Sequence, residues 1–274
     1  MDIFNILIII GLLNFSLSVD EGMWRDYPTC KIGRLQSPIN IKEYESIYAN
    51  NFSFVYQNYK DCVGTKKDNY AYTIVFGEGT GGYINFERGG VIKQYEFIRA
   101  ELYTALHEID GEKGDYELHL IHKKNLDFVT NKNQYRSIQD PNMYLVIVLR
   151  YQNCTKEGKV CTNDNGLLDK LTSNPTDFNL GQYNIFQDKR AYFYEGSFIH
   201  IPCDENVNYY IVKDFFHFDK NLPDFKDNFN NIKLANIFGR PVYKNFMNYR
   251  EVLGNNYFSF KNVVVSFLFI IILL

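Results

Sequence analysis

Short stretches of alternating apolar and polar residues recur along the chain, and this alternation predicts half-buried β-strands. One stretch, Met143–Tyr151, is almost continuously apolar and predicts a strand covered on both faces at the centre of a sheet. Apolar residues three or four positions apart predict short helices at Gly166–Ser173 and Pro223–Asn231. The other predicted strands are Tyr70–Phe76, Tyr83–Arg88, Val91–Tyr103 as one long strand or two short ones, Tyr116–His122 and Tyr209–Val212. Together these elements predict one mainly β (α+β) domain with short peripheral helices.

The N-terminal stretch Ile6–Phe15 is mostly apolar and is followed by small residues at Ser16 and Ser18. This pattern predicts a signal peptide over residues 1–18. An uncleaved signal anchor is the alternative, although the apolar run is shorter than the ~20 residues of a membrane-spanning helix. The protein is therefore expected to be secreted or to lie at the extracellular face of the cell membrane.

The C-terminal stretch Val263–Leu274 is apolar except for Ser266, and a spacer separates it from Gly254 and Asn255. Small residues, a spacer and a terminal apolar tail are typical of a GPI-attachment signal. We expect attachment at Gly254 or Asn255, removal of residues 255–274, and one domain over residues 19–254. A tail-anchor helix or a terminal strand packed on the domain are the alternatives.

Composition and charge narrow the class of partner. Aromatic residues make up 17% of the 274 residues, which suits strands and a well-filled interior. The formal net charge of -3 shows no basic excess, so nucleic acid is not an expected partner.

The chain has five cysteines and no CxxC pair, which argues against a zinc ribbon or a thioredoxin-like motif. In an oxidising compartment disulfides are expected, and the odd number leaves one thiol over. Asn51 and Asn153 each begin a glycosylation sequon, which agrees with secretion.

Several segments resemble the α-carbonic anhydrase family. QSPINI at Gln36–Ile41 is similar to the family's N-terminal signature, and YELHLIH at Tyr116–His122 is similar to its Glu-Leu-His-Leu-Val-His strand. His107 lies twelve residues before His119, as in the family. YFYEGS at Tyr192–Ser197 and Arg240-Pro241 resemble two further family segments. The matches occur in the family's order and extend from Trp24 to Asn245, across nearly the whole predicted mature chain.

The resemblance implies a large, twisted, mostly antiparallel central sheet surrounded by short helices and loops. In extracellular members, a cysteine before the QSP signature pairs with one after the Gly-Ser segment, which here implies a Cys30–Cys203 disulfide. Cys154 and Cys161 are close enough in sequence to form a local bridge, and Cys62 would then be the leftover thiol.

The family hydrates CO2 with a zinc ion held by three histidines, two from a His-x-His strand and one from the Glu-x-His strand. Only the third, His119, is present, and Glu101 and Tyr103 occupy the His-x-His positions. A register one residue earlier would place Ala100 and Leu102 there. No histidine precedes His107, so the resemblance implies a vestigial site at Glu101, Tyr103 and His119 that holds no metal or other cofactor.

Other catalytic positions have also changed. The family's hydroxide-binding Thr aligns with Ile199, its Glu partner with Leu106, and its proton-shuttle His with Tyr70. No catalytic residue is therefore expected. His107, Glu117 and Tyr194 remain, and the resemblance implies that they form a buried polar cluster.

These changes favour a catalytically inactive domain that binds or adheres to an extracellular protein or glycan and is attached to the membrane by a GPI anchor. The alternative is an active carbonic anhydrase with an atypical zinc site. A third hypothesis is a hydrolase in which Glu101, close to His119, acts as general base.

Overall fold

The protein is described by a computed structural model. The described residues are Cys30, 33–49, 52–68, 72–77, 79–128, 143–155, 166–173, 176–183, 185, 189–200, 202–219, 222, 234–235 and 240–246. None of the helices in these ranges is long and apolar enough to span a membrane.

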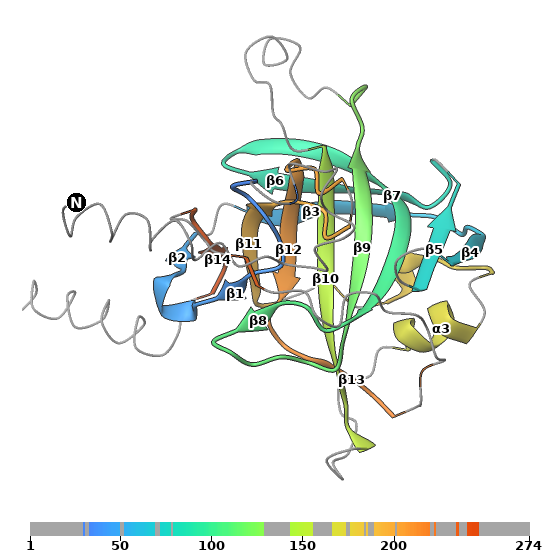
Figure 1. The fold of residues 1–274 in the computed structure, drawn as a ribbon. Coiled ribbons are helices and arrows are strands. Elements are labelled where there is room, and N and C mark those ends of the chain that lie inside the picture. The colour runs from blue at the N-terminus through green and yellow to red at the C-terminus, as the bar shows by residue number, and fades with distance from the viewer. Residues whose placement is uncertain are drawn as a thin grey trace, which may run out of the picture.

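Strands dominate the described chain (Figure 1). The strands are β1 (Asn40–Ile41), β2 (Ile47–Tyr48), β3 (Phe52–Tyr59), β4 (Gly64–Asp68), β5 (Tyr72–Phe76), β6 (Gly82–Arg88), β7 (Val91–Thr104), β8 (Glu108–Ile109), β9 (Tyr116–Lys124), β10 (Tyr144–Asn153), β11 (Ala191–Gly196), β12 (Val207–Val212), β13 (Phe216–Phe218) and β14 (Tyr243–Lys244). The helical elements are η1 (Glu43–Glu45), α3 (Leu167–Ser173) and η3 (Leu180–Gln182).

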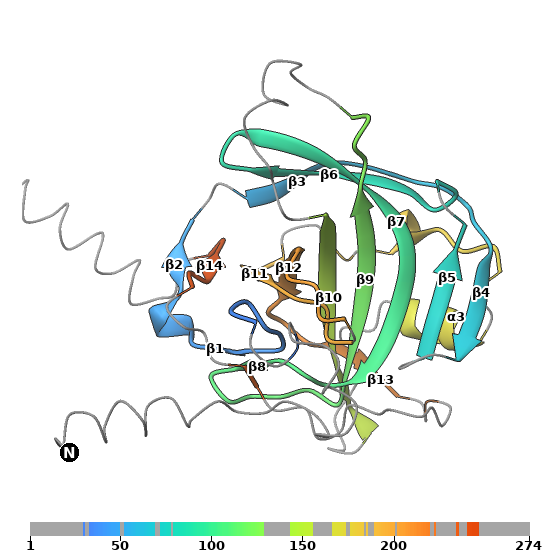
Figure 2. The same ribbon diagram turned by 45° about the horizontal axis from the view of Figure 1, so that its top comes forward.

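Twelve of the strands form one sheet, and β1 and β8 form a separate pair. The main order is β2-β14-β11-β12-β10-β9-β7-β5-β4. Outside this order, β6 pairs with β7, β3 pairs with β6, and β13 pairs with β10. The β10–β12, β10–β13 and β14–β2 pairs are parallel, and the other pairs of this sheet are antiparallel. Figure 2 shows the sheet strongly curved, with β2 and β14 at one side and β4 and β5 at the other. The predicted large, mostly antiparallel sheet is confirmed.

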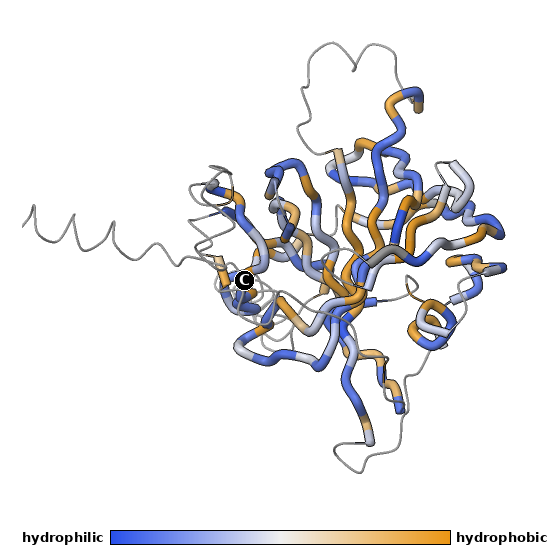
Figure 3. Tube along the Cα trace, turned by 45° about the vertical axis from the view of Figure 1, so that its right-hand side comes forward, coloured by the Kyte–Doolittle hydropathy of each residue, from blue (hydrophilic) through white to orange (hydrophobic). Residues whose placement is uncertain are grey.

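β10 lies in the middle of this order and is buried along most of its length, as its apolar run predicted. Its alternate residues face two different apolar layers, because successive side chains of a strand point to opposite faces. Leu145, Ile147 and Leu149 belong to the larger layer, and Val146 and Val148 to the smaller one. Hydrophobic residues accordingly concentrate in the central strands (Figure 3).

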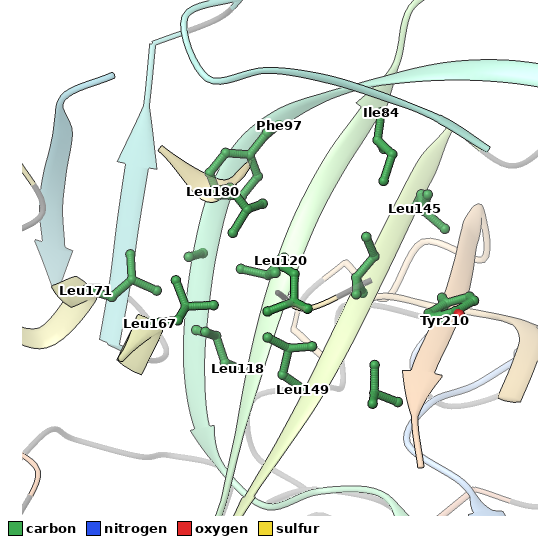
Figure 4. Packing of buried hydrophobic residues seen from close by; sticks show 14 of the residues in the cluster. Ile84, Phe97, Leu118, Leu120, Leu145, Leu149, Leu167, Leu171, Leu180 and Tyr210 are labelled. Carbon is green, nitrogen blue, oxygen red and sulfur yellow. The ribbon is translucent and has the colours of Figure 1, made fainter. Parts of the chain in front are cut away.

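The larger layer is closed by α3, whose residues Leu167, Leu168 and Leu171 are buried against the sheet. Figure 4 shows Leu167 next to Leu118 of β9, with Leu171 on the other side of Leu167. The helix confirms the prediction for Gly166–Ser173, whereas the helix predicted at Pro223–Asn231 lies entirely outside the described residues.

Three segments that carried the family resemblance meet at one end of β11. The backbone amide of Ser37 donates to Ser197 Oγ at 3.1 Å, and the Ser197 amide lies 3.3 Å from Ser37 Oγ. A Cβ at Gly196 would come within 2.3 Å of Ser37 Oγ, so this close approach requires glycine. Arg240 donates to the carbonyl of Glu195 at 3.0 Å and also to the carbonyl of Gln36. These hydrogen bonds hold the N-terminal segment at Gln36 and Ser37 against the end of β11.

The Cys30–Cys203 disulfide is confirmed and closes a sequence separation of 173 residues. Cys154 is also disulfide-bonded, while its predicted partner Cys161 lies outside the described residues. Cys62 carries a free, buried thiol, as predicted, and burial raises its pKa to about 11. A thiol with so high a pKa is a poor nucleophile at neutral pH, so Cys62 is a structural residue.

Candidate functional site

The site at His119 is built on two paired strands. β7 and β9 run antiparallel, with Glu101 opposite His119 and Tyr103 opposite Glu117. Residues opposite each other, and residues two apart on one strand, share a face of the sheet. All four side chains therefore gather on one face, which is the face that the predicted vestigial site required.

A bulge in β7 puts Glu101 and Tyr103 on this face. The register between β7 and β9 shifts between Phe97 and Arg99, so one extra residue is inserted into β7. Before the shift, Phe97 packs in the larger apolar layer, and after it Ala100 and Leu102 do. The structure thus places Glu101 and Tyr103 beside His119, and the alternative pair Ala100 and Leu102 on the opposite face.

His107, Glu117 and Tyr194 form a fully buried polar cluster. His107 donates its backbone amide to Glu117 Oε1 at 2.7 Å, and its Nδ1 lies 2.8 Å from Oε2. Its Nε2 lies 2.7 Å from the Tyr194 hydroxyl, which in turn lies 3.0 Å from Ser37 Oγ. Burial alone would raise the pKa of Glu117, but His107 and His119 bring it well below its usual range. Glu117 is therefore a buried carboxylate whose charge is held by hydrogen bonds.

His119 is oriented by the same carboxylate. Its Nε2 lies 3.0 Å from Glu117 Oε2, and its ring packs 4.8 Å from that of Tyr103. Because Nε2 faces Glu117, Nδ1 is the ring nitrogen left for any ligand on this face. His119 is 2% exposed, so such a ligand would have to enter a nearly closed site.

Glu101 is engaged by its neighbours on β7. Arg99 Nε donates to Oε1 at 2.7 Å, and the Tyr103 hydroxyl donates to Oε2 at 2.6 Å. His200 Nε2 lies 3.8 Å from Oε1 and 3.4 Å from Arg99 Nη2. Burial would raise the pKa of Glu101, but Arg99, followed by His200 and Tyr103, lowers it below its usual value. A charged carboxylate paired with a guanidinium thus stands at the first of the two changed ligand positions.

Tyr103, Leu106 and Ile199 form a small apolar cluster of their own, and each is at most 4% exposed. In the family, a Thr and a Glu would stand at the positions of Ile199 and Leu106. Here both positions carry apolar side chains, Ile199 and Leu106. No buried hydroxyl or carboxylate is therefore left at either position without a hydrogen-bond partner. The third changed catalytic position, Tyr70, lies outside the described residues.

The catalytic zinc of the family does not fit this set of side chains. His119 is the one imidazole that β7 and β9 present beside Glu101, and both Glu101 oxygens are already hydrogen-bonded. The other nearby imidazole, that of His200, comes from the loop after β11 and lies 3.4 Å from the Arg99 guanidinium. Burial and the neighbouring Glu101 raise the pKa of Tyr103 well above its usual value, so it stays a protonated phenol. A tetrahedral site with three protein ligands cannot be assembled from one imidazole and these two groups without breaking their bonds.

His107, Glu117 and His119 are the one group in the described chain whose ligand atoms lie close enough for a metal, within 4.8 Å of one another. Those atoms already bind one another or Tyr194, as described above. His122 takes no part, because it lies on the opposite face, where its Nε2 meets the Tyr59 hydroxyl at 2.9 Å. That placement agrees with its odd spacing from His119 along the strand.

Arg99 and His200 are the residues of this site that we did not predict from the sequence. Arg99 precedes Glu101 by two positions, and this spacing alone places the two side chains on one face of the strand. His200 comes from the loop after β11, and its ring stacks on Phe198 with centroids 5.1 Å apart. Nothing in its sequence neighbourhood indicates that it approaches β7.

The glycosylation sequons remain predictions. Asn51 lies outside the described residues. Asn153 is buried, and its Oδ1 accepts from the amide and the hydroxyl of Thr155 at 2.9 and 2.7 Å.

The sheet, the QSP–Gly-Ser contact and the Glu-x-His strand define the class of protein. The sequence model of the eukaryotic-type carbonic anhydrase family matches residues 19–253, and the chain belongs to this family.

Individual relatives are distant. Dioscorin dioA3 of Dioscorea japonica is 22% identical over 194 residues, which cover 69% of this chain and 64% of dioscorin. The chain thus spans less than two thirds of the length of that curated relative.

Two solved structures share the fold. The crystal structure of a dioscorin complexed with ascorbate matches with a TM-score of 0.62 and 18% identity, covering 84% of this chain and 97% of that one. The α-carbonic anhydrase of Thermovibrio ammonificans, complexed with the inhibitor sulfanilamide, matches with a TM-score of 0.57 and 20% identity, covering 79% and 90%.

Proposed function

We propose that this member of the carbonic anhydrase family is a non-catalytic binding domain at the extracellular face of the cell membrane. It takes an extracellular protein or glycan as its ligand, binds no catalytic metal and does not hydrate CO2. A GPI anchor at Gly254 or Asn255 attaches it to the membrane.

The observation that carries the proposal is the state of Glu101. Its carboxylate occupies a ligand position opposite His119 and is bound to Arg99 and Tyr103. A guanidinium beside this position adds a fixed positive charge where the family places a cation. Electrostatic repulsion and the lack of imidazoles both oppose zinc binding there.

The surroundings support the same conclusion. The apolar cluster of Tyr103, Leu106 and Ile199 fills the space where a zinc-bound hydroxide would need a hydrogen-bond acceptor and donor. Hydroxide in such surroundings would lose its hydrogen bonds to water and gain none from these side chains. Glu117 and His107 then serve to hold the sheet together, through their bonds to one another and to Tyr194.

Metal content and CO2 hydration, measured together on the purified chain, test the proposal. We expect less than one tenth of an equivalent of zinc after dialysis against micromolar zinc, and a hydration rate equal to that of buffer. A family member with three histidine ligands, treated in parallel, gives the positive control. Stoichiometric zinc with sulfonamide-sensitive hydration would refute the proposal.

The alternative is a carbonic anhydrase with an atypical metal site, and the closeness of His107, Glu117 and His119 favours it. The two functions differ in their response to Glu117→Gln. A metal site built on these residues would lose its metal in this variant, whereas a purely structural cluster would lose stability with no metal to lose.

The ligand can be sought independently. One solved dioscorin structure contains ascorbate, so ascorbate is a rational first small-molecule probe for the face around His119 and Arg99. Glycan arrays and cell-surface crosslinking address the proposed protein or glycan ligand. Saturable binding of none of them by folded protein would argue against a binding role.

The anchor has its own test. Phosphatidylinositol-specific phospholipase should release the protein from expressing cells, and Gly254→Leu together with Asn255→Leu should prevent surface display. Complete retention after the enzyme treatment would show that the attachment is of another kind.

A further inference from the structure

Three basic side chains share one face of the sheet near the turn between β6 and β7. Arg88 in β6 lies opposite Val91, and Lys93 follows Val91 by two positions in β7. Lys124 in β9 lies opposite Tyr95, which is two positions beyond Lys93. Residues opposite each other, and residues two apart on one strand, point to the same side. We name Arg88, Lys93 and Lys124 the basic cluster.

The side chains of the basic cluster are close enough to act on one another electrostatically. The pKa of Lys93 is lowered from 10.5 to about 8, first by burial and then by the charges of Lys124 and Arg88, while Glu195 acts in the opposite direction. Two cations therefore outweigh one carboxylate in the field at Lys93. An anion bound between these side chains would relieve their repulsion and stabilise the charged form of Lys93.

Arg88 is held in place by residues of β11 and β14. Its Nη1 donates to Glu195 Oε1 at 2.6 Å, and its guanidinium carbon lies 4.6 Å from the ring centre of Phe193 and 5.8 Å from that of Tyr243. The side chains of Arg88 and Glu195 are still 33% and 38% exposed. The cluster therefore combines one fixed guanidinium at the surface with two lysines, and a fixed donor loses little conformational freedom when it binds a ligand.

The basic cluster is separate from the site at His119. Lys124 follows His119 by five positions along β9, so the two side chains point to opposite faces of the sheet. On the strand opposite, Tyr95 belongs to the larger apolar layer, whereas Glu101 faces His119. A ligand at the basic cluster would therefore leave the bonds of Glu101 and His119 unchanged.

We propose that the basic cluster binds a sulfate ester carried by an extracellular glycan. A sulfate ester keeps a full negative charge at neutral pH and spreads it over its terminal oxygens, so ammonium and guanidinium groups can donate to it from several directions. The inference rests on the binding role in the proposed function and deepens it by naming the class of ligand. It is independent of the reason for the loss of catalysis.

The first test measures the reactivity of Lys93 in the full-length, unsubstituted chain. A lowered pKa leaves more of the amine unprotonated, so acetylation by an N-hydroxysuccinimide ester at neutral pH should be fast at Lys93. A sulfated disaccharide should slow this acetylation severalfold, as read by peptide mass spectrometry, and the desulfated disaccharide should not. Lys113 is the control, because it is exposed and precedes β9 at the end opposite Lys124.

The second test measures affinity for the sulfated disaccharide by calorimetry. Lys93→Gln together with Lys124→Gln should weaken binding about tenfold, because charge-assisted hydrogen bonds to the sulfate are lost. Lys60→Gln together with Lys113→Gln removes the same charge from exposed positions outside the cluster and should leave the affinity unchanged. Lys93→Arg together with Lys124→Arg should retain most of the affinity. Circular dichroism checks that each variant is folded, and the acetylation test decides if the glutamine pair is not.

Several outcomes would overturn the proposal: equal protection by the sulfated and desulfated disaccharides, equal protection of Lys113, or unchanged affinity in the folded glutamine pair. Tighter binding of a phosphorylated disaccharide would overturn the sulfate ester as the ligand. Inorganic sulfate that binds as tightly as the disaccharide would overturn the glycan.

The proposed function is judged separately. Zinc-dependent CO2 hydration refutes the non-catalytic domain even if the sulfated disaccharide binds. Lack of disaccharide binding by a chain that is also inactive in hydration refutes the basic cluster as a sulfate site and leaves the loss of catalysis standing.

Discussion

Rebuilding the metal site tests the central argument most directly. The variant carries Glu101→His, Tyr103→His, Leu106→Glu and Ile199→Thr, and keeps His119 as the third ligand. The first two changes restore imidazoles on the site face, as the observed register requires. The last two must be made together, because a buried Glu or Thr without its partner is costly.

The expected magnitude follows from ligand linkage. Zinc at one hundred times its dissociation constant stabilises the folded state by about 2.7 kcal/mol. For a domain of this size, that corresponds to a rise in melting temperature of roughly 5 to 10 °C. Without zinc the variant should be less stable than the natural chain, since it gives up the apolar cluster of Tyr103, Leu106 and Ile199.

The assay is thermal unfolding with zinc and with a chelator, together with elemental analysis of the dialysed protein. The same variant with His119→Ala is the control and should show neither bound zinc nor a thermal shift. If the rebuilt chain has the circular dichroism of the natural one but binds no zinc, the assignment of Glu101 and Tyr103 to the ligand positions is wrong.

Three further predictions concern stability. Glu101→Gln should lower the free energy of unfolding by about 2 kcal/mol in urea titrations, because a buried charge-assisted bond is lost. Glu195→Gln breaks the half-buried, more solvated pair with Arg88 and should cost less than ~1 kcal/mol, and equal costs would contradict the argument from burial. Burial lowers the pKa of His122 to about 4 from 6.5, so the unfolded chain takes up this proton first as the pH falls. Stability should therefore be unaffected by His122 above pH 6.5 and fall by on the order of 3 kcal/mol towards pH 4. His122→Gln should flatten that decline, and an unchanged slope would refute the assignment. Replacing Cys30 and Cys203 by Ser should cost ~2–5 kcal/mol, measured from denaturant titrations. When both proteins are measured in reductant, which also opens the bridge at Cys154, the difference should disappear.

Sequence patterns identified most of the long strands that are apolar on at least one face, but missed β3 (Phe52–Tyr59) and β11 (Ala191–Gly196). β10 and β9 were predicted because their buried residues repeat clearly. β4 (Gly64–Asp68) was missed because it is a polar edge strand that owes its place to pairing with β5. The two-residue strands β1, β2, β8 and β14 arise from tertiary hydrogen bonding, which leaves no periodic signal in so few residues.

The part of the site that follows from the spacing of the family's motifs could be predicted from the sequence. Tyr103 and Glu101 could be aligned with lost ligands, but two registers were open until the bulge between Phe97 and Arg99 was seen. Arg99 shares the face of Glu101 by simple alternation, because the bulge lies before both residues, but no sequence pattern indicated that the two side chains pair. His200 depends on the path of a loop, which local sequence does not determine.

The bond between Arg99 and Glu101 also constrains how such a chain can change over generations. Glu101→His alone sets an imidazole against a guanidinium, Leu106→Glu alone buries a lone carboxylate, and Ile199→Thr alone places a hydroxyl among apolar neighbours. Each single step lowers stability, while the benefit of a metal appears only when the whole set is complete. Under the proposed function, a population of such chains would cross a fitness valley before it could assemble a three-histidine zinc site.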